Sequence, residues 1–143
     1  MRLRHSPPQN SRIGQVSRLD EANVRAMLAQ HFEHARSDPE LAHAMYHDDA
    51  VLEFPQSGER FLGVANFREW RSNRPTSSSF EIREVRGRDD LWVAEGAISY
   101  DDGPWNFAVT ILEFRGDKIA RETIYVDEGW EAPEQRARWR AAP

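Results

Sequence analysis

Residues 91–126 have the sequence LWVAEGAISYDDGPWNFAVTILEFRGDKIARETIYV, and this stretch determines most of the architecture. It contains three apolar runs rich in β-branched and aromatic residues, at 91–100, 105–114 and 118–126. The segments between the runs, DDGP and RGD, carry residues that favour tight turns. Runs of this length joined by short turns predict an antiparallel meander of three strands.

The first half of the chain predicts helices. Residues 19–36 place apolar side chains at intervals of three and four, as in an amphipathic helix. Pro39 suits the first turn of a second helix, which we expect to end near residue 46 before a turn at Asp48-Asp49. The other expected elements are a strand at 50–54, a loop at 56–62, a helix at 63–72, a linker at 75–79, a strand at 80–85 and a short helix at 131–142. Helices followed by a curved meander predict an α+β fold that encloses a pocket.

Length and composition predict one domain. A chain of 143 residues with 39% hydrophobic residues is long enough to build a single core. We expect that domain to span residues 18–143. Residues 1–17 are polar and contain Pro7-Pro8, which predicts a flexible arm. The alternative is an arm that packs on a partner subunit.

The composition also disfavours several function classes. A net charge of −5 argues against nucleic acid as a partner. No apolar stretch is long enough to span a membrane, and the N-terminus lacks the apolar segment of a secretory signal. The absence of cysteine excludes disulfides and thiol nucleophiles, and agrees with a cytoplasmic location.

Three segments resemble one known family. They are YHDDAVLEFP at 46–55, GVANFREW at 63–70, and GDKI at 116–119 followed by ETIYVD at 122–127. In this order and spacing the chain resembles, over about residues 19–127, the SnoaL-like branch of the nuclear transport factor 2-like superfamily. The resemblance implies a cone: a strongly curved, mostly antiparallel sheet wrapped around helices, with a mostly apolar internal pocket. It also implies a homodimer formed through the outer face of the sheet.

The resemblance does not select one function, because relatives include ketosteroid isomerases, polyketide cyclases, limonene-epoxide hydrolases, dehydratases and non-catalytic binding modules. With ungapped spacing, the isomerase base corresponds to Phe54 and its oxyanion-stabilising acid to Thr110. The isomerase tyrosine corresponds to Gln30, and the acid of cyclases and epoxide hydrolases to Ile124. None of these catalytic sets is complete in this chain.

The alternation of side chains along strands and the periodicity of the first helix indicate other candidate catalytic residues. Glu122 is the carboxylate that alternation places on the inner face of the last strand. His31 is the one ionisable residue on the apolar stripe of the first helix, where a neutral imidazole can act as a base. A His–Glu pair inside the cone would be able to move a proton. Glu53 is a third candidate, which points outward by parity and inward only with a bulge near Pro55.

Each candidate also has a purely structural interpretation. His31 is then a core histidine bonded to a backbone carbonyl or to Tyr125, and Glu122 forms a strand-end salt bridge with Arg121 or Arg83. His43 and His47 have a spacing that can hold a metal, but no carboxylate accompanies them, so we expect a solvated surface and no metal.

The remaining site residues are expected to form the pocket wall. The candidates for ligand contact are Phe54, Trp70, Trp92, Tyr100, Asn106, Thr110 and Ile124. Arg71 and Arg74 follow Trp70 near the expected mouth, where a solvated helix end is the default and attraction of an anionic ligand is the alternative.

Three functions remain open from the sequence. The first is a proton-transfer enzyme, of isomerase, cyclase, dehydratase or hydrolase type, acting on a small apolar molecule. The second is a binding module with the same cavity and no acid–base pair. The third is a dimerisation domain whose cavity is filled by aromatic side chains. None of the three calls for a cofactor, and we expect none.

Overall fold

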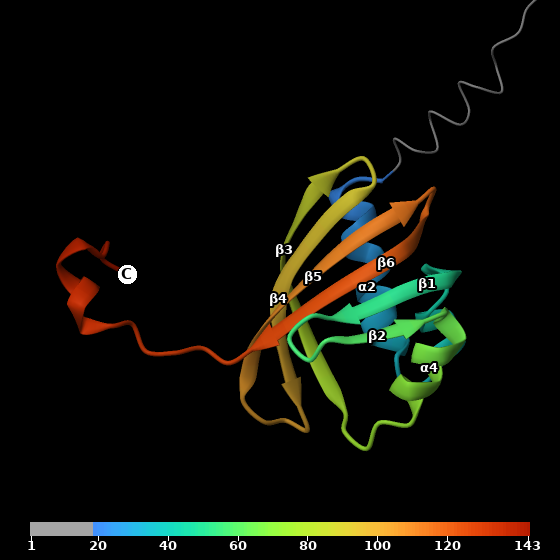
Figure 1. The fold of residues 1–143 in the computed structure, drawn as a ribbon, viewed down its shortest axis with the longest axis horizontal. Coiled ribbons are helices and arrows are strands. Elements are labelled where there is room, and N and C mark those ends of the chain that lie inside the picture. The colour runs from blue at the N-terminus through green and yellow to red at the C-terminus, as the bar shows by residue number, and fades with distance from the viewer. Residues whose placement is uncertain (1–18) are drawn as a thin grey trace, which may run out of the picture.

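The computed structural model describes residues 19–143, so the predicted N-terminal arm lies outside the described residues. The helical elements are α2 (Glu21–His34), α3 (Pro39–Ala42), α4 (Val64–Ser72) and the 3-10 helix η1 (Glu134–Trp139). The strands are β1 (Tyr46–Phe54), β2 (Glu59–Leu62), β3 (Ser78–Arg88), β4 (Leu91–Tyr100), β5 (Trp105–Arg115) and β6 (Lys118–Asp127). Helix α2 crosses one face of the sheet, and α4 lies beside β1 and β2 (Figure 1).

The six strands form one sheet in the order β2-β1-β6-β5-β4-β3. All neighbouring strands are antiparallel except β1 and β6, which pair in parallel. The register shifts between Ile82 and Glu84 and between Glu113 and Phe114, and such bulges bend a strand and increase its twist. The predicted α+β fold with a curved, mostly antiparallel sheet is therefore confirmed.

The core lies between α2, α4 and the concave face of the sheet. Val24 and Leu28, four residues apart on α2, share one helix face and are fully buried. They pack in the same cluster as Phe67 of α4 and Leu112 of β5. Burial of side chains of this size stabilises the fold by about 1.5–3 kcal/mol each.

Three local predictions were wrong, and the short helix expected at 131–142 forms over fewer residues. The second helix ends at Ala42, and Asp48-Asp49 belongs to β1 and not to a turn. Strand β1 begins at Tyr46 because this segment pairs with β6. Tyr46 is paired with Ile119, and the N–H of Ile119 donates to the Met45 carbonyl. The expected loop at 56–62 contains strand β2, which pairs with β1 as a hairpin. The C-terminal element is the short 3-10 helix η1, and it lies away from the sheet (Figure 1).

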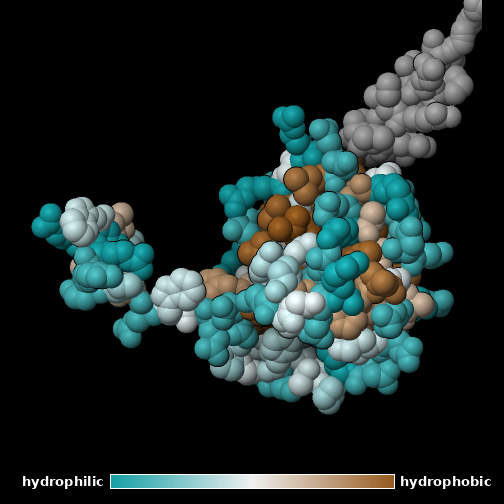
Figure 2. Space-filling model, viewed as in Figure 1, coloured by the Kyte–Doolittle hydropathy of each residue, from teal (hydrophilic) through white to brown (hydrophobic). Residues whose placement is uncertain are grey.

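Apolar side chains also lie on the outside of the sheet. Figure 2 shows them among polar groups on the face turned to the viewer. The exposed large side chains of the three meander strands are Leu91, Trp105, Phe107 and Tyr125. Among the described residues, no helix has both the length and the apolarity needed to span a membrane.

Candidate functional site

A cavity of about 840 Å³ opens between α2, the end of α4 and the concave face of the sheet. Its wall combines aromatic and aliphatic side chains with polar and charged ones. The aromatic side chains that line it are Phe32, Phe54, Phe61, Trp70, Phe80 and Tyr100. A cavity of this size, with aromatic side chains on its wall beside charged and hydroxyl-bearing ones, has the character of a small-molecule site.

One carboxylate, Glu122 of β6, lies buried in this cavity with only 5% of its surface exposed. The Tyr46 hydroxyl donates to its Oε1, and the Thr110 hydroxyl donates to its Oε2 over 2.5 Å. The guanidinium of Arg71 lies 3.7 Å from Oε1. Tyr46 does not line the cavity. Its hydroxyl therefore holds the Glu122 carboxylate from the side that faces the protein interior.

Arg71, in the last turn of α4, is the cation of the site. It donates to the Tyr46 hydroxyl and to His43 Nε2, both over 3.2 Å, and its guanidinium lies 5.3 Å from the centre of the Phe67 ring. Burial opposes the charged form, but Tyr46 and Glu122 outweigh burial and raise the pKa of Arg71. Burial also raises the pKa of Tyr46, with Glu122 adding to the effect. Arg71 is therefore charged and Tyr46 is a neutral donor at neutral pH.

His31 and His43 form a neutral layer beside this cluster. The Nδ1–H of His31 donates to the Ala42 carbonyl, and that of His43 donates to the Pro39 carbonyl, each over 2.7 Å. Burial, reinforced by the charge of Arg71, lowers the pKa of His31 to about 3 and that of His43 to about 4. His43 Nε2 accepts from Arg71, whereas within residues 19–143 no donor contacts Nε2 of His31, the other imidazole on the cavity wall.

The cavity brings together most of the residues that the sequence nominated, and leaves three elsewhere. His31, Glu122, Phe54, Trp70, Tyr100, Thr110 and Ile124 line it. Trp92 is in the core, where its indole N–H donates to the Asp89 carbonyl, and Asn106 is half-buried away from the cavity. Glu53 points to the outer face and pairs with Arg121 and Arg60.

The expected direct pair of His31 and Glu122 does not form, and each side chain has other partners. Within residues 19–143 no hydrogen bond joins the two side chains. Tyr46 and Arg71 contact Glu122 instead, and His31 is bonded to the Ala42 carbonyl. The hydrogen bond from His31 to a backbone carbonyl agrees with the purely structural interpretation of this residue. The same interpretation paired Glu122 with Arg121 or Arg83, and neither arginine is its partner.

Sequence reasoning missed Tyr46 and misjudged two other residues. The expectation of a solvated His43 is wrong, since it is 4% exposed and contacts Arg71. The Arg71 side chain is only 13% exposed and is therefore not part of a solvated helix end. One signal was present for Arg71. It follows Phe67 by four residues, so both share the inner face of α4.

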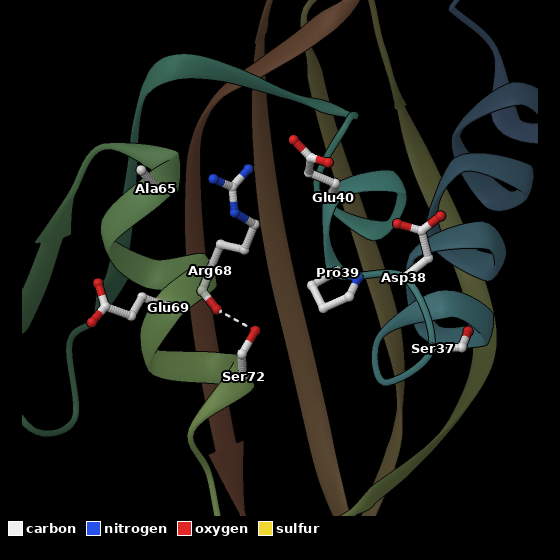
Figure 3. Close-up of a pocket in the computed structure, with 8 residues that line it drawn as sticks. All are labelled: Ser37, Asp38, Pro39, Glu40, Ala65, Arg68, Glu69 and Ser72. Carbon is white, nitrogen blue, oxygen red and sulfur yellow. Dashed lines mark hydrogen bonds between the residues drawn. The ribbon is translucent and has the colours of Figure 1, made fainter.

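A second hollow, between α3 and α4, has a different character (Figure 3). It is open and polar, with Glu40 and Arg68 on its two sides. The Ser72 hydroxyl there donates to the Arg68 carbonyl within α4, as the dashed line in Figure 3 shows. In the part of the chain that the structure describes, no group of histidine and acidic side chains is arranged to hold a metal ion.

Comparisons with known proteins define the family. A profile of the SnoaL-like domain matches residues 20–122, most of the chain, so the chain belongs to the SnoaL-like family. A solved NTF-2-like protein of unknown function from Burkholderia xenovorans LB400 is 37% identical to it. The match covers 85% of this chain and 96% of that one, with a TM-score of 0.75. The predicted family is confirmed, and a search of curated proteins found no match.

More distant solved structures share the fold. A ketosteroid isomerase candidate from Kribbella flavida is 20% identical, with a TM-score of 0.73 over 87% of this chain and 92% of that one. An LEH-like epoxide hydrolase from M. tuberculosis is 14% identical, with a TM-score of 0.63 over 75% of this chain and 84% of that one. At these identities the likeness concerns the fold and not the chemistry.

Proposed function

We propose that this protein is a proton-transfer enzyme that binds an apolar small molecule in the cavity and uses Glu122 as its general base. One observation carries the proposal: a single buried carboxylate, held by Tyr46, Thr110 and Arg71, lies in a cavity with aromatic walls. Burying an ion pair costs free energy that an apolar pair of similar volume avoids, so such a pair is poorly explained by stability alone. Charged groups gathered in a cleft are typical of functional sites.

The two oxygens of Glu122 have different surroundings. Oε1 accepts from Tyr46 and faces Arg71, whereas Oε2 accepts only from Thr110 among the residues that the structure describes. A carboxylate offers about four acceptor positions, so Oε2 keeps one free for a substrate proton. In the proposed step a substrate C–H or O–H bond breaks, the proton moves to Oε2, and the electron pair stays on the substrate.

The same cluster supports the charge that this step creates. Arg71 is a fixed cation beside the carboxylate, in an apolar surrounding where electrostatic interactions are stronger than in water. The negative charge that develops on the substrate is stabilised by this cation. Isomerisation, dehydration and cyclisation can each begin with such a proton removal.

A nitrobenzisoxazole is a suitable test substrate, because it is apolar, aromatic and has one acidic C–H. Removal of that proton breaks the ring N–O bond and releases a coloured cyanonitrophenolate. We expect the wild type to catalyse this ring opening, and Glu122→Gln to reduce the rate roughly a hundredfold or more. Glu113→Gln, which changes a carboxylate on the outer face of β5, is the matched control. Equal rates for wild type and Glu122→Gln, with the probe bound to both, contradict the proposal.

The alternative is a non-catalytic binding module. It is favoured by Phe54 and Ile124, which line the cavity where relatives with known chemistry carry acids. In that case the Tyr46–Glu122–Arg71 cluster would act as a polar anchor for a ligand. Binding of the probe without turnover is the result that selects this function.

We also infer that the protein forms a homodimer through the outer face of its sheet. The support is the set of exposed aromatic and aliphatic side chains on β4, β5 and β6, of which Phe107 is 56% exposed. Monomers expose few large contiguous apolar patches.

A further inference from the structure

A second arginine on the cavity wall, Arg74, has no acidic partner. It follows α4, lines the cavity, and places its guanidinium 5.5 Å from the centre of the Trp70 ring. Its Nε is buried without a hydrogen-bond partner, and no carboxylate within residues 19–143 lies at ion-pair distance from it. An arginine on the cavity wall without an acidic partner leaves a positive charge that an anionic ligand would balance.

Three arginines and three glutamates line the cavity, but Arg36, Glu33 and Glu59 are exposed at the surface, and the charges in the inner part do not balance. Glu122 is already paired with Arg71, and the other carboxylates on the wall, Glu33 and Glu59, are exposed side chains at the surface. Both histidines are neutral at pH 7, because burial and Arg71 lower their pKa values. Burial, with Arg71 adding to it, lowers the pKa of Arg74 as well. The inner part of the cavity therefore holds one positive charge without a counter-charge.

We propose that the ligand of this cavity is an amphipathic organic acid, whose apolar body lies against the aromatic wall and whose carboxylate binds Arg74. The inference rests on the proposed function only in taking the cavity as a small-molecule site. The guanidinium of Arg74 lies over the Trp70 ring, and its planar fork matches the geometry of a carboxylate. Thr76, Ser78 and Tyr100 line the same cavity and offer hydroxyl groups to the second carboxylate oxygen.

The test compares two competitors of the same shape. N-phenylnaphthylamine, a neutral dye that fluoresces in apolar sites, fills the cavity of the full chain at pH 7. Naphthoate and naphthamide are then titrated separately to displace it. We expect naphthoate to displace the dye at a concentration at least about tenfold lower than naphthamide, the ratio that a charge-assisted hydrogen bond of about 1.4 kcal/mol gives.

Variants identify the group that recognises the charge. In Arg74→Gln the preference for naphthoate should fall to within about twofold, while the dye itself still binds. Arg36→Gln removes an exposed arginine from the same cavity and should keep the preference. If Arg74→Gln does not fold, Arg74→Met is measured in its place. The comparison of naphthoate with naphthamide on the wild type does not depend on either variant.

Two results overturn the inference. One is equal displacement by the acid and the amide in the wild type. The other is a preference that survives the loss of the Arg74 charge. Neither depends on turnover, because displacement measures binding alone. A cavity that prefers the acid but does not open nitrobenzisoxazole contradicts only the proposed catalysis, and one that opens it without preferring the acid contradicts only this inference.

Discussion

His31 and His43 make the stability of the protein depend on pH. Burial lowers the pKa of His31 from 6.5 to about 3, so in the folded state it stays neutral where the unfolded chain takes up a proton. Its stabilising contribution is therefore complete above about pH 6.5 and is lost as the pH falls toward 3. Between these limits the free energy of unfolding decreases by about 1.4 kcal/mol per pH unit for each such group.

Replacing His31 by glutamine should reduce this dependence. The amide can still donate to the Ala42 carbonyl, but it has no proton to gain. Urea unfolding at pH 5 and pH 7.5 measures the difference, in a range above the titration of most carboxylates. We expect the wild type to lose clearly more stability than His31→Gln over this interval, and His34→Gln, on the same helix, to behave as the wild type. Identical losses for wild type and His31→Gln contradict this account of burial.

At the scale of elements, the pairing of β3 with β4 depends on a glycine. A Cβ added at Gly96 would lie 2.2 Å from the Glu81 carbonyl oxygen and 3.0 Å from the Phe80 ring. Phe80 in turn stacks on Phe32 of α2, with ring centres 4.1 Å apart. A methyl group at this position therefore forces apart the strand pair and the contact that holds α2 on the sheet.

We expect Gly96→Ala to lower the free energy of unfolding by about 2 kcal/mol or more, the usual cost of overpacking against an element that cannot shift freely. Gly116→Asn is the control. Gly116 has φ +69° and no neighbour within 4 Å, and asparagine tolerates left-handed backbone. Thermal unfolding of both variants measures the contrast. If the thermal unfolding midpoint of Gly96→Ala equals that of the wild type, β3 shifts to accommodate the methyl group without a loss of stability, and the prediction is wrong.

The sequence predicted best the elements whose contacts are with segments adjacent in the chain. The meander at 91–126 forms from adjacent strands and tight turns, and alternation along β6 places Glu122 inward. Pairing of β1 with β6 joins segments about 70 residues apart, as Leu52 with Glu122, and no local pattern encodes it. Tyr46 reaches Glu122 only through that pairing, so its role was not visible in the sequence.

Parity also predicts which face a strand residue occupies but not its depth in the cone. Trp92 and Tyr100 belong to the same face of β4, but Trp92 is packed in the core and Tyr100 lines the cavity. Asn106 lies near the turn after β4, and its depth in the cone likewise leaves it away from the cavity. The depth depends on where the helices close the cone, which is a property of tertiary packing.

At the scale of the whole molecule, the proposed homodimer depends on the outer face of the sheet. Trp105 and Phe107 of β5 are 52% and 56% exposed, and Tyr125 of β6 is 41% exposed. A second copy related by a two-fold axis would cover this patch with the same patch, since such an interface is self-complementary. We therefore expect light scattering after gel filtration to give twice the 16.6 kDa of one chain.

Phe107→Lys places a charge in the centre of that patch, where a partner would have to bury it, and should return the measured mass to that of one chain. Leu62→Lys is the matched control, because Leu62 is 59% exposed on edge strand β2 and outside the meander. The cavity opens on the opposite side of the sheet, so the Phe107→Lys monomer should keep dye binding and thereby show that its fold is intact. A wild type that elutes as a monomer, or a Phe107→Lys variant that remains a dimer, rules out this face as the interface, and the exposed aromatic side chains would then require another explanation.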